Sequence, residues 1–121
     1  MNLTNRETVP PFTTKDSSEI RELFNPRLTA DCKNLSVAEA TLAAGQATLP
    51  HRHPHSEEVY YFLRGEGELT VNGETRRVAT NDTAHIPAGA THQCRNAGAA
   101  PLAFLCFCAP PYAHADTVLA E

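Results

Sequence analysis

The sequence has no cluster of basic residues and no stretch in which basic and aromatic residues alternate. Its 121 residues include 10 Lys and Arg against 14 Asp and Glu, which gives a formal net charge of −4. Nucleic acids and anionic membrane surfaces attract proteins mainly through clustered positive charge. We therefore expect neither of them as the main partner of this chain.

Long apolar segments are also missing. The longest apolar run, residues 101–111, is shorter than the roughly 20 residues that a membrane-spanning helix needs. The first residues, MNLTNRETVPPF, contain no hydrophobic signal segment. We expect a cytoplasmic protein that does not enter a membrane. Disulfides are rare in that compartment, so the four cysteines are expected as free thiols.

No segment shows the 3.6-residue periodicity of a long amphipathic helix. Short runs rich in β-branched and aromatic residues instead alternate with turns that contain Gly, Pro or Asn. Asn72-Gly73 predicts a type I′ hairpin between two of these runs. The pattern and the length predict an all-β fold, an antiparallel barrel or sandwich, in one domain. The expected strands cover residues 35–42, 59–63, 68–71, 74–78, 91–95 and 102–108, with a short one ending at Ile86.

The N-terminal part of the chain is less regular. Residues 1–15 include Pro10-Pro11 and have no clear period, so we expect an arm that either frays or adds to the sheet of a partner. In residues 16–25 a capping-box pattern, Asp16 with Glu19, competes with a segment barely two helical turns long. We favour a strand there. Residues 16–121 are expected as the folded domain.

One stretch, GQATLPHRHPHSEEVYYFLRG, holds three of the six histidines and two adjacent glutamates. On an extended strand residues i and i+2 point to the same face, so the imidazoles of His51 and His53 can reach one ion. Borderline divalent metals take neutral imidazole nitrogens, and a carboxylate adds charge. Strict alternation places Glu57 on the histidine face, whereas an interruption at Pro54 places Glu58 there.

This stretch and a second one, IPAGATHQCRN, resemble the two motifs of the cupin superfamily. The first motif is Gly, five residues, His-x-His, three or four residues, Glu, six residues, Gly, and every spacing is met. The second is Gly, five residues, Pro-x-Gly, two residues, His, three residues, Asn. Its first position holds Asn81, and Asn tolerates the left-handed conformation. The matching residues are Gly45, His51, His53, Glu58 and Gly65, then Pro87, Gly89, His92 and Asn96.

The resemblance implies a cupin-type antiparallel jelly-roll barrel with one divalent ion of Fe, Mn, Ni or Zn. The motifs select Glu58 over Glu57 and add His92, so the implied ligands are His51, His53, Glu58 and His92. We expect a metal-dependent enzyme that acts on a small polar molecule, with dioxygenase-type chemistry first and isomerase or lyase chemistry next. The alternative is a non-catalytic module that binds or senses a small ligand or sugar. Small cupins commonly pair through their sheets, so a homodimer is expected.

Three further residues are candidates for the pocket of such a barrel. Tyr60 shares the parity of Glu58, so its hydroxyl is expected at the pocket wall and it is a candidate catalytic residue. His55 is a second candidate, as an accessory acid or base or a substrate contact, although exposure is the favoured interpretation. His85 either enters the pocket or faces outward.

The thiols and the tail have open roles. We interpret the thiols as small buried packing residues rather than metal ligands, although the alternative is thiolate ligation. The tail from residue 112 onward is expected as loop or short helix. Its polar side chains either cover the mouth of the pocket, contact a partner chain or form a solvated end. The residues concerned are Cys94, Cys106 and Cys108, and Tyr112, His114 and Asp116.

Overall fold

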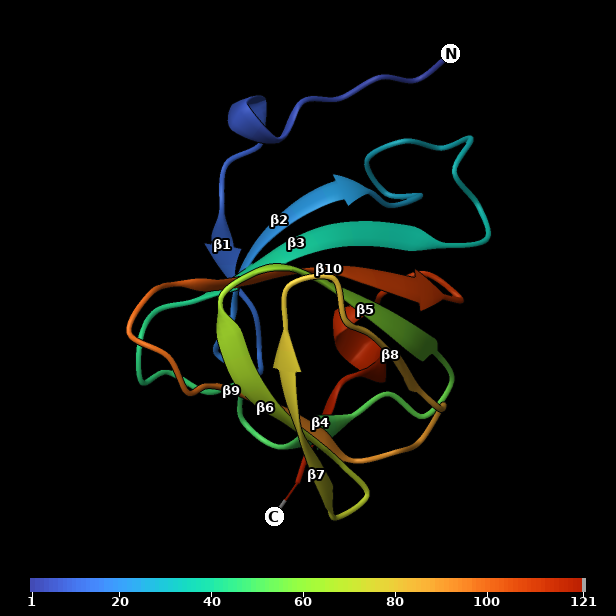
Figure 1. Ribbon diagram of the computed structural model, residues 1–121. Helices are drawn as coiled ribbons and strands as arrows, with labels where there is room; N and C mark the ends of the chain where they lie inside the picture. The colour runs from blue at the N-terminus through green and yellow to red at the C-terminus, as the bar shows by residue number, and fades with distance from the viewer. Residues whose placement is uncertain (121) are drawn as a thin grey trace.

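The computed structural model describes residues 1–120, which form two antiparallel β-sheets that face each other (Figure 1). The first sheet has the strand order β1-β2-β3-β10-β5-β8, and the second has the order β11-β4-β9-β6-β7. The expected all-β antiparallel fold is confirmed. Two 3₁₀ turns are the helical elements within this range, and no helix of the described residues has the length and apolar character to cross a bilayer.

The strands follow the runs predicted from the sequence, with three short additions at β1, β4 and β11. The first sheet contains β1 (Phe12–Thr13), β2 (Glu19–Phe24), β3 (Ser36–Leu42), β10 (Leu102–Ala109), β5 (Glu57–Arg64) and β8 (Thr83–Ile86). The second contains β11 (Val118–Leu119), β4 (His51–Arg52), β9 (His92–Asn96), β6 (Glu66–Val71) and β7 (Glu74–Ala79). The 3₁₀ turns are η1 (Arg6–Thr8) and η2 (His114–Asp116).

The inner face of β5 changes from apolar to polar along the strand. Phe62, Tyr60 and Glu58 alternate inward and are all buried, because successive side chains of a strand point to opposite faces. On β10, Phe104 pairs with Phe62, and Cys108 pairs with Glu58. The apolar end of this ladder belongs to the hydrophobic core, and the polar end opens into the site described below.

Two turns use the left-handed backbone that their sequences predict. Asn72 and Gly73 have φ values of 48° and 83°, which is the type I′ geometry expected between β6 and β7. Asn81, which occupies the glycine position of the second motif, has φ 74°. Its side-chain oxygen accepts a hydrogen bond from the Tyr61 hydroxyl at 2.9 Å. The exchange of Gly for Asn therefore leaves the turn intact.

The N-terminal segment, expected as an arm, contacts its own chain from Arg6 onward, while Met1 and Leu3 are exposed. Phe12 and Thr13 pair with β2 as an edge strand. Arg6 donates to the buried Glu39 carboxylate at 2.9 Å, and Arg21 donates to the backbone oxygen of Val9 at 2.7 Å. The favoured strand over residues 16–25 is confirmed as β2. The homodimer stays a prediction.

Gly45 and Gly65 provide a test of how the first motif is built. Both have positive φ, 79° and 86°, which costs an L-residue about 1–2 kcal/mol. A Cβ at Gly45 would meet no atom within 4 Å, whereas one at Gly65 would lie 2.6 Å from the backbone oxygen of Pro101. We predict that Gly45→Ala lowers the free energy of unfolding by about 1 kcal/mol and Gly65→Ala by roughly twice that or more. Urea denaturation measures both; equal losses would contradict the backbone contact at Gly65.

Candidate metal centre

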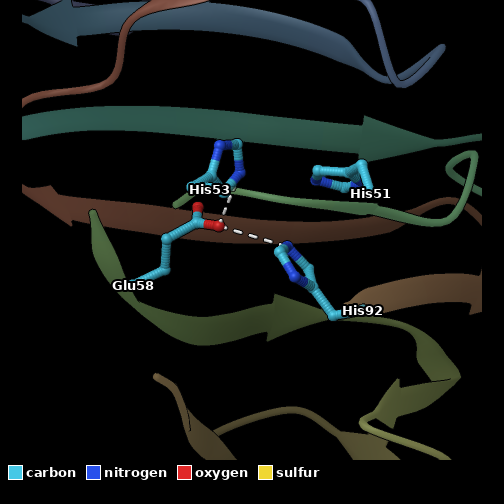
Figure 2. A group of neighbouring side chains, drawn as sticks. All are labelled: His51, His53, Glu58 and His92. Carbon is cyan, nitrogen blue, oxygen red and sulfur yellow. Dashed lines mark ion pairs between the residues drawn. The ribbon is translucent and has the colours of Figure 1, made fainter. Parts of the chain in front are cut away.

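Three imidazoles and one carboxylate meet between the two sheets (Figure 2). His51 on β4 and His92 on β9 are directly paired in the second sheet, and His53 follows β4. Glu58 reaches them from β5 in the first sheet. One ligand atom from each residue lies within 4.8 Å of all the others, and all four residues are buried. The structure therefore brings together the four residues that the motifs indicate.

The segment between β4 and β5 decides which glutamate enters the site. The chain bends at Pro54, and β5 starts at Glu57. Glu58 then faces inward, while Glu57 is exposed with its carboxylate 2.8 Å from Nε2 of His85. The interruption of strict alternation at Pro54 thus has the expected effect. His85 lies on the outer face and does not line the site.

The imidazoles of His51 and His92 are oriented by backbone carbonyls. Nδ1 of His51 lies 2.7 Å from the oxygen of Leu49, and Nδ1 of His92 lies 3.0 Å from the oxygen of Ala90. A carbonyl oxygen can only accept, so each Nδ1 carries the proton and donates it. Each Nε2 then holds a lone pair that faces the site, which is the form in which histidine binds metals.

His53 reaches the same state through the C-terminal tail. Its Nδ1 lies 3.3 Å from the hydroxyl oxygen of Thr117. That hydroxyl donates its own proton to the backbone oxygen of Ala113, at 3.3 Å, so its oxygen accepts from Nδ1–H. In its neutral form, His53 therefore faces Glu58 with a lone pair on Nε2, like the other two histidines.

The carboxylate of Glu58 lies close to two imidazole nitrogens of this site. Oε1 of Glu58 is 2.9 Å from Nε2 of His53 and 3.1 Å from Nε2 of His92 (Figure 2). Oε1 of Glu58 and Nε2 of His92 are nevertheless buried without a hydrogen-bond partner. Two ligands at right angles around an ion at ~2.1 Å lie about 3 Å apart. The spacing and the unsatisfied lone pairs fit a divalent cation.

The charges of the metal-free site point the same way. Burial alone raises the pKa of Glu58, but protons carried by the imidazoles of His53 and His92 in the metal-free site outweigh it and hold that pKa well below its usual range. Burial lowers the pKa of His53, but the Glu58 carboxylate outweighs this and raises it, so a proton takes the place of a metal ion there. Burial lowers the pKa of His51, and the nearby His92 lowers it further. The site therefore offers an ionised carboxylate and at least one imidazole that resists protonation, as a metal ligand set requires.

The two catalytic candidates lie in different surroundings. Tyr60 is buried and lines a cavity beside the metal site, and burial raises its pKa well above the usual value, so it is a neutral phenol that can donate a hydrogen bond. The ring of His55 is 84% exposed and does not line the cavity. Exposure, the favoured interpretation for His55, is what the structure shows.

The three thiols near the site are neutral groups. Cys94 is buried in the hydrophobic core, and burial raises its pKa to about 12. Cys106 lines the cavity, and burial raises its pKa well above the usual value. Cys108 donates to Oε2 of Glu58 at 3.2 Å, the carboxylate oxygen that does not face the histidines. Its sulfur therefore orients the ligand Glu58 rather than adding to the four donors.

The tail covers one side of the site, which was one of three open alternatives. The ring of Tyr112 lies 6.0 Å from that of His53, and Tyr112 lines the cavity. The carboxylate of Asp116 accepts hydrogen bonds from the backbone N–H groups of His55 and Ser56 at 3.2 Å. His114 is exposed in η2. These contacts hold the tail against the segment that carries His53.

Sequence reasoning missed two residues at the site, Asp16 and Thr117. Oδ2 of Asp16 lies 3.2 Å from Nε2 of His51, and Thr117 orients His53. The pattern around Asp16 resembled a helix cap, and nothing local marks Thr117. Asn96 of the second motif is structural: its amide donates to the backbone oxygens of Leu42 and Ala100, both at 2.9 Å.

Comparison with known proteins supports the resemblance seen in the motifs. A family model described as Cupin domain matches residues 38–108, which include all four donors. An uncharacterised protein of Methanocaldococcus jannaschii is 42% identical over 118 residues, 98% of this chain and 94% of its own length. A mannose-1-phosphate guanylyltransferase of Salmonella typhimurium is 29% identical over 97 residues; these are 80% of this chain but only 18% of that protein.

Among solved structures, a predicted oxalate decarboxylase from Thermotoga maritima is similar with a TM-score of 0.79. The match covers 89% of this chain and 98% of that one at 23% sequence identity. At this identity the similarity concerns the fold alone. The expected cupin-type jelly roll is confirmed.

His92 tests whether the two motifs form one site. We predict that His92→Ala folds, because the ring lies at the polar end of the interior, and that it lowers metal affinity roughly 100-fold or more. Metal content after dialysis and the circular dichroism spectrum measure the two properties. The control is His114→Ala, an exposed tail residue that should change neither. Stoichiometric metal in folded His92→Ala would contradict the shared site.

The depressed pKa of Glu58 predicts how the metal-free protein responds to acid. A carboxylate with a lowered folded-state pKa stabilises the fold above its unfolded pKa, and this stabilisation is lost as the pH falls. Between about pH 5 and about pH 3, the free energy of unfolding should therefore fall more steeply in wild type than in Glu58→Gln, by up to roughly 1 kcal/mol per pH unit. Urea denaturation in the presence of a chelator measures both slopes. Parallel slopes would show that Glu58 is not held ionised.

Proposed function

The chain belongs to the cupin family, and from this premise we propose that it is a metal-dependent enzyme that acts on a small polar molecule. The observation that carries the proposal is the buried set of four donor residues, in which Oε1 of Glu58 and Nε2 of His92 have no hydrogen-bond partner. A structural role alone does not account for it, because unpaired buried polar atoms destabilise a fold unless a cation satisfies them.

The position of the donor set beside a cavity supports a role in catalysis. His51, His53 and Glu58 line a small cavity with a volume of about 40 Å³ open to water-sized molecules. Ions of Fe, Mn, Ni or Zn accept up to five or six ligands, and the chain supplies four, so a small molecule in the cavity can complete the set. A bound ion of this kind supplies Lewis acidity or, where it is redox-active, activation of dioxygen.

Other residues of the chain can provide a hydrogen bond to the bound molecule, an apolar wall and support for the donor set. Tyr60 offers a neutral hydroxyl as a hydrogen-bond donor to a bound molecule. Ile20, Ala40 and Phe104 form an apolar part of the wall that limits access of water. The second histidine nitrogens, held by Leu49, Ala90 and Thr117, keep the donor set in place before anything binds.

Dioxygenase-type chemistry is the first reaction class that we propose, because three neutral imidazoles and one carboxylate suit a redox-active divalent ion. Isomerase or lyase chemistry comes next. The structurally similar protein of T. maritima is described as a predicted oxalate decarboxylase, which is a lyase-type activity. That likeness concerns the fold, and the activity of a cupin depends on the residues of its own cavity.

A non-catalytic module that binds a small ligand or sugar is the second candidate. The similarity to a mannose-1-phosphate guanylyltransferase favours it, because that protein carries a related segment of 97 aligned residues within a much longer chain. In this alternative the ion would fix the ligand without turning it over. The two candidates differ in the identity of the ion and in turnover.

Elemental analysis of protein purified without added metal, together with oxygen uptake during a screen of small polar compounds, separates the candidates. We expect stoichiometric redox-active metal and oxygen uptake that depends on one class of compound. Tyr60→Phe should keep the metal and lower that uptake by about tenfold, since it removes one hydrogen bond. A spectroscopically silent metal with ligand binding but no turnover would favour the binding module, and protein without any metal affinity would contradict both.

A further inference from the structure

The cavity beside the metal centre is acidic. Three carboxylates line it, those of Asp16, Glu22 and Glu58, and no Lys or Arg belongs to its lining within the described residues. Two basic side chains that are close in sequence have other partners. Lys15 donates to backbone oxygens of the tail at 2.8 and 3.2 Å, and the Arg27 side chain, 59% exposed, pairs with Glu22.

Glu22 has one carboxylate oxygen without a partner. The residue is 4% exposed and lines the cavity, and Arg27 pairs with Oε2. Oε1 is buried and accepts no hydrogen bond. A buried carboxylate oxygen is stable only when a donor satisfies it. Glu22 therefore points, independently of the metal site, to a ligand that brings hydrogen-bond donors.

Asp16 is held so that one oxygen remains free next to the metal centre. Its Oδ1 accepts three hydrogen bonds, from the hydroxyls of Thr14 and Ser18 at 2.6 Å and from the Ser18 backbone N–H at 3.0 Å. These bonds fix the rotamer. Oδ2 lies 3.2 Å from Nε2 of His51. Because the proton of His51 is on Nδ1, this nitrogen does not donate to Oδ2, and Oδ2 can accept from a ligand.

We propose that Asp16 is a specificity-determining residue whose Oδ2 accepts a hydrogen bond from the molecule bound beside the ion. The cavity accordingly selects small neutral or cationic ligands with hydroxyl or amino groups over anions. This inference rests on the proposed metal site. The charges of Asp16 and Glu58 balance a divalent ion, and Glu22 is balanced by Arg27, so an anionic ligand adds unbalanced charge to a cavity that is lined mostly by buried side chains.

Two probes of matched shape test the proposal: glycolate, an anion, and glycolamide, its neutral amide. Both can bind a metal through two oxygens, and the amide replaces one carboxylate oxygen by an N–H donor. Dissociation constants are measured on cobalt-loaded protein from the visible spectrum of the ion. The variant is Asp16→Asn, which keeps an Oδ1 acceptor for the bonds of Ser18 and Thr14. The control is Glu57→Gln, which removes a neighbouring carboxylate that lies outside the cavity.

In Asp16→Asn we expect glycolate to bind about fivefold more tightly and glycolamide no more tightly than in wild type, so that the preference for the amide falls by at least about fivefold. Glu57→Gln should leave the preference unchanged. The proposal is overturned if Asp16→Asn and Glu57→Gln have the same preference, or if glycolamide does not bind to the cobalt-loaded wild type. Loss of cobalt from Asp16→Asn alone would overturn it by making Asp16 a metal ligand.

The cobalt content of each protein distinguishes a failure of the Asp16 assignment from a failure of the proposed metal site. If wild type takes up no cobalt, the metal site itself is wrong. If wild type binds cobalt and the probe preference does not depend on Asp16, the metal site stands and the assignment of Asp16 fails.

Discussion

The contact on which the structure depends joins Oε1 of Glu58, from one sheet, to the imidazoles of His53 and His92 on the opposite side. At 2.9 and 3.1 Å these atoms are as close as hydrogen-bonded partners, yet Oε1 and Nε2 of His92 have none. Lone pairs at such distances repel unless a positive charge lies among them. Hydrogen bonds with the surrounding structure hold these donors in this arrangement.

Groups around the site orient the three imidazoles and the carboxylate of Glu58. The three imidazole rings are oriented by the carbonyl oxygens of Leu49 and Ala90 and by the hydroxyl of Thr117. The thiol of Cys108 donates a hydrogen bond to Oε2 of Glu58, the oxygen that does not face the histidines. Behind them the ladder between β5 and β10 passes into the aromatic core. The apolar end of the sandwich thus supports a polar end in which two buried atoms, Oε1 of Glu58 and Nε2 of His92, lack hydrogen-bond partners.

Both ends of the chain complete the site. The turn before β2 brings Asp16 to His51, and the tail brings Thr117 to His53. Lys15 joins the two segments by donating to backbone oxygens of His114 and Thr117. The two motifs therefore hold the donors, while the segments outside them shape the cavity and its charge. Differences in these outer segments are a physical reason why proteins with this fold can differ in ligand.

Glu58 and His92 were indicated by the resemblance of the two motifs to those of cupins. Alternation along a strand, which acts within a few residues, placed His51 and His53 on one face. The same holds for the hairpin at Asn72-Gly73 and for the left-handed turn at Asn81. The roles of Asp16 and Thr117 depended on the tertiary structure alone. Thr117 is 64 positions from its partner His53, and Asp16 is 35 positions from His51. Contacts at that separation arise from the packing of whole sheets, which no local periodicity encodes.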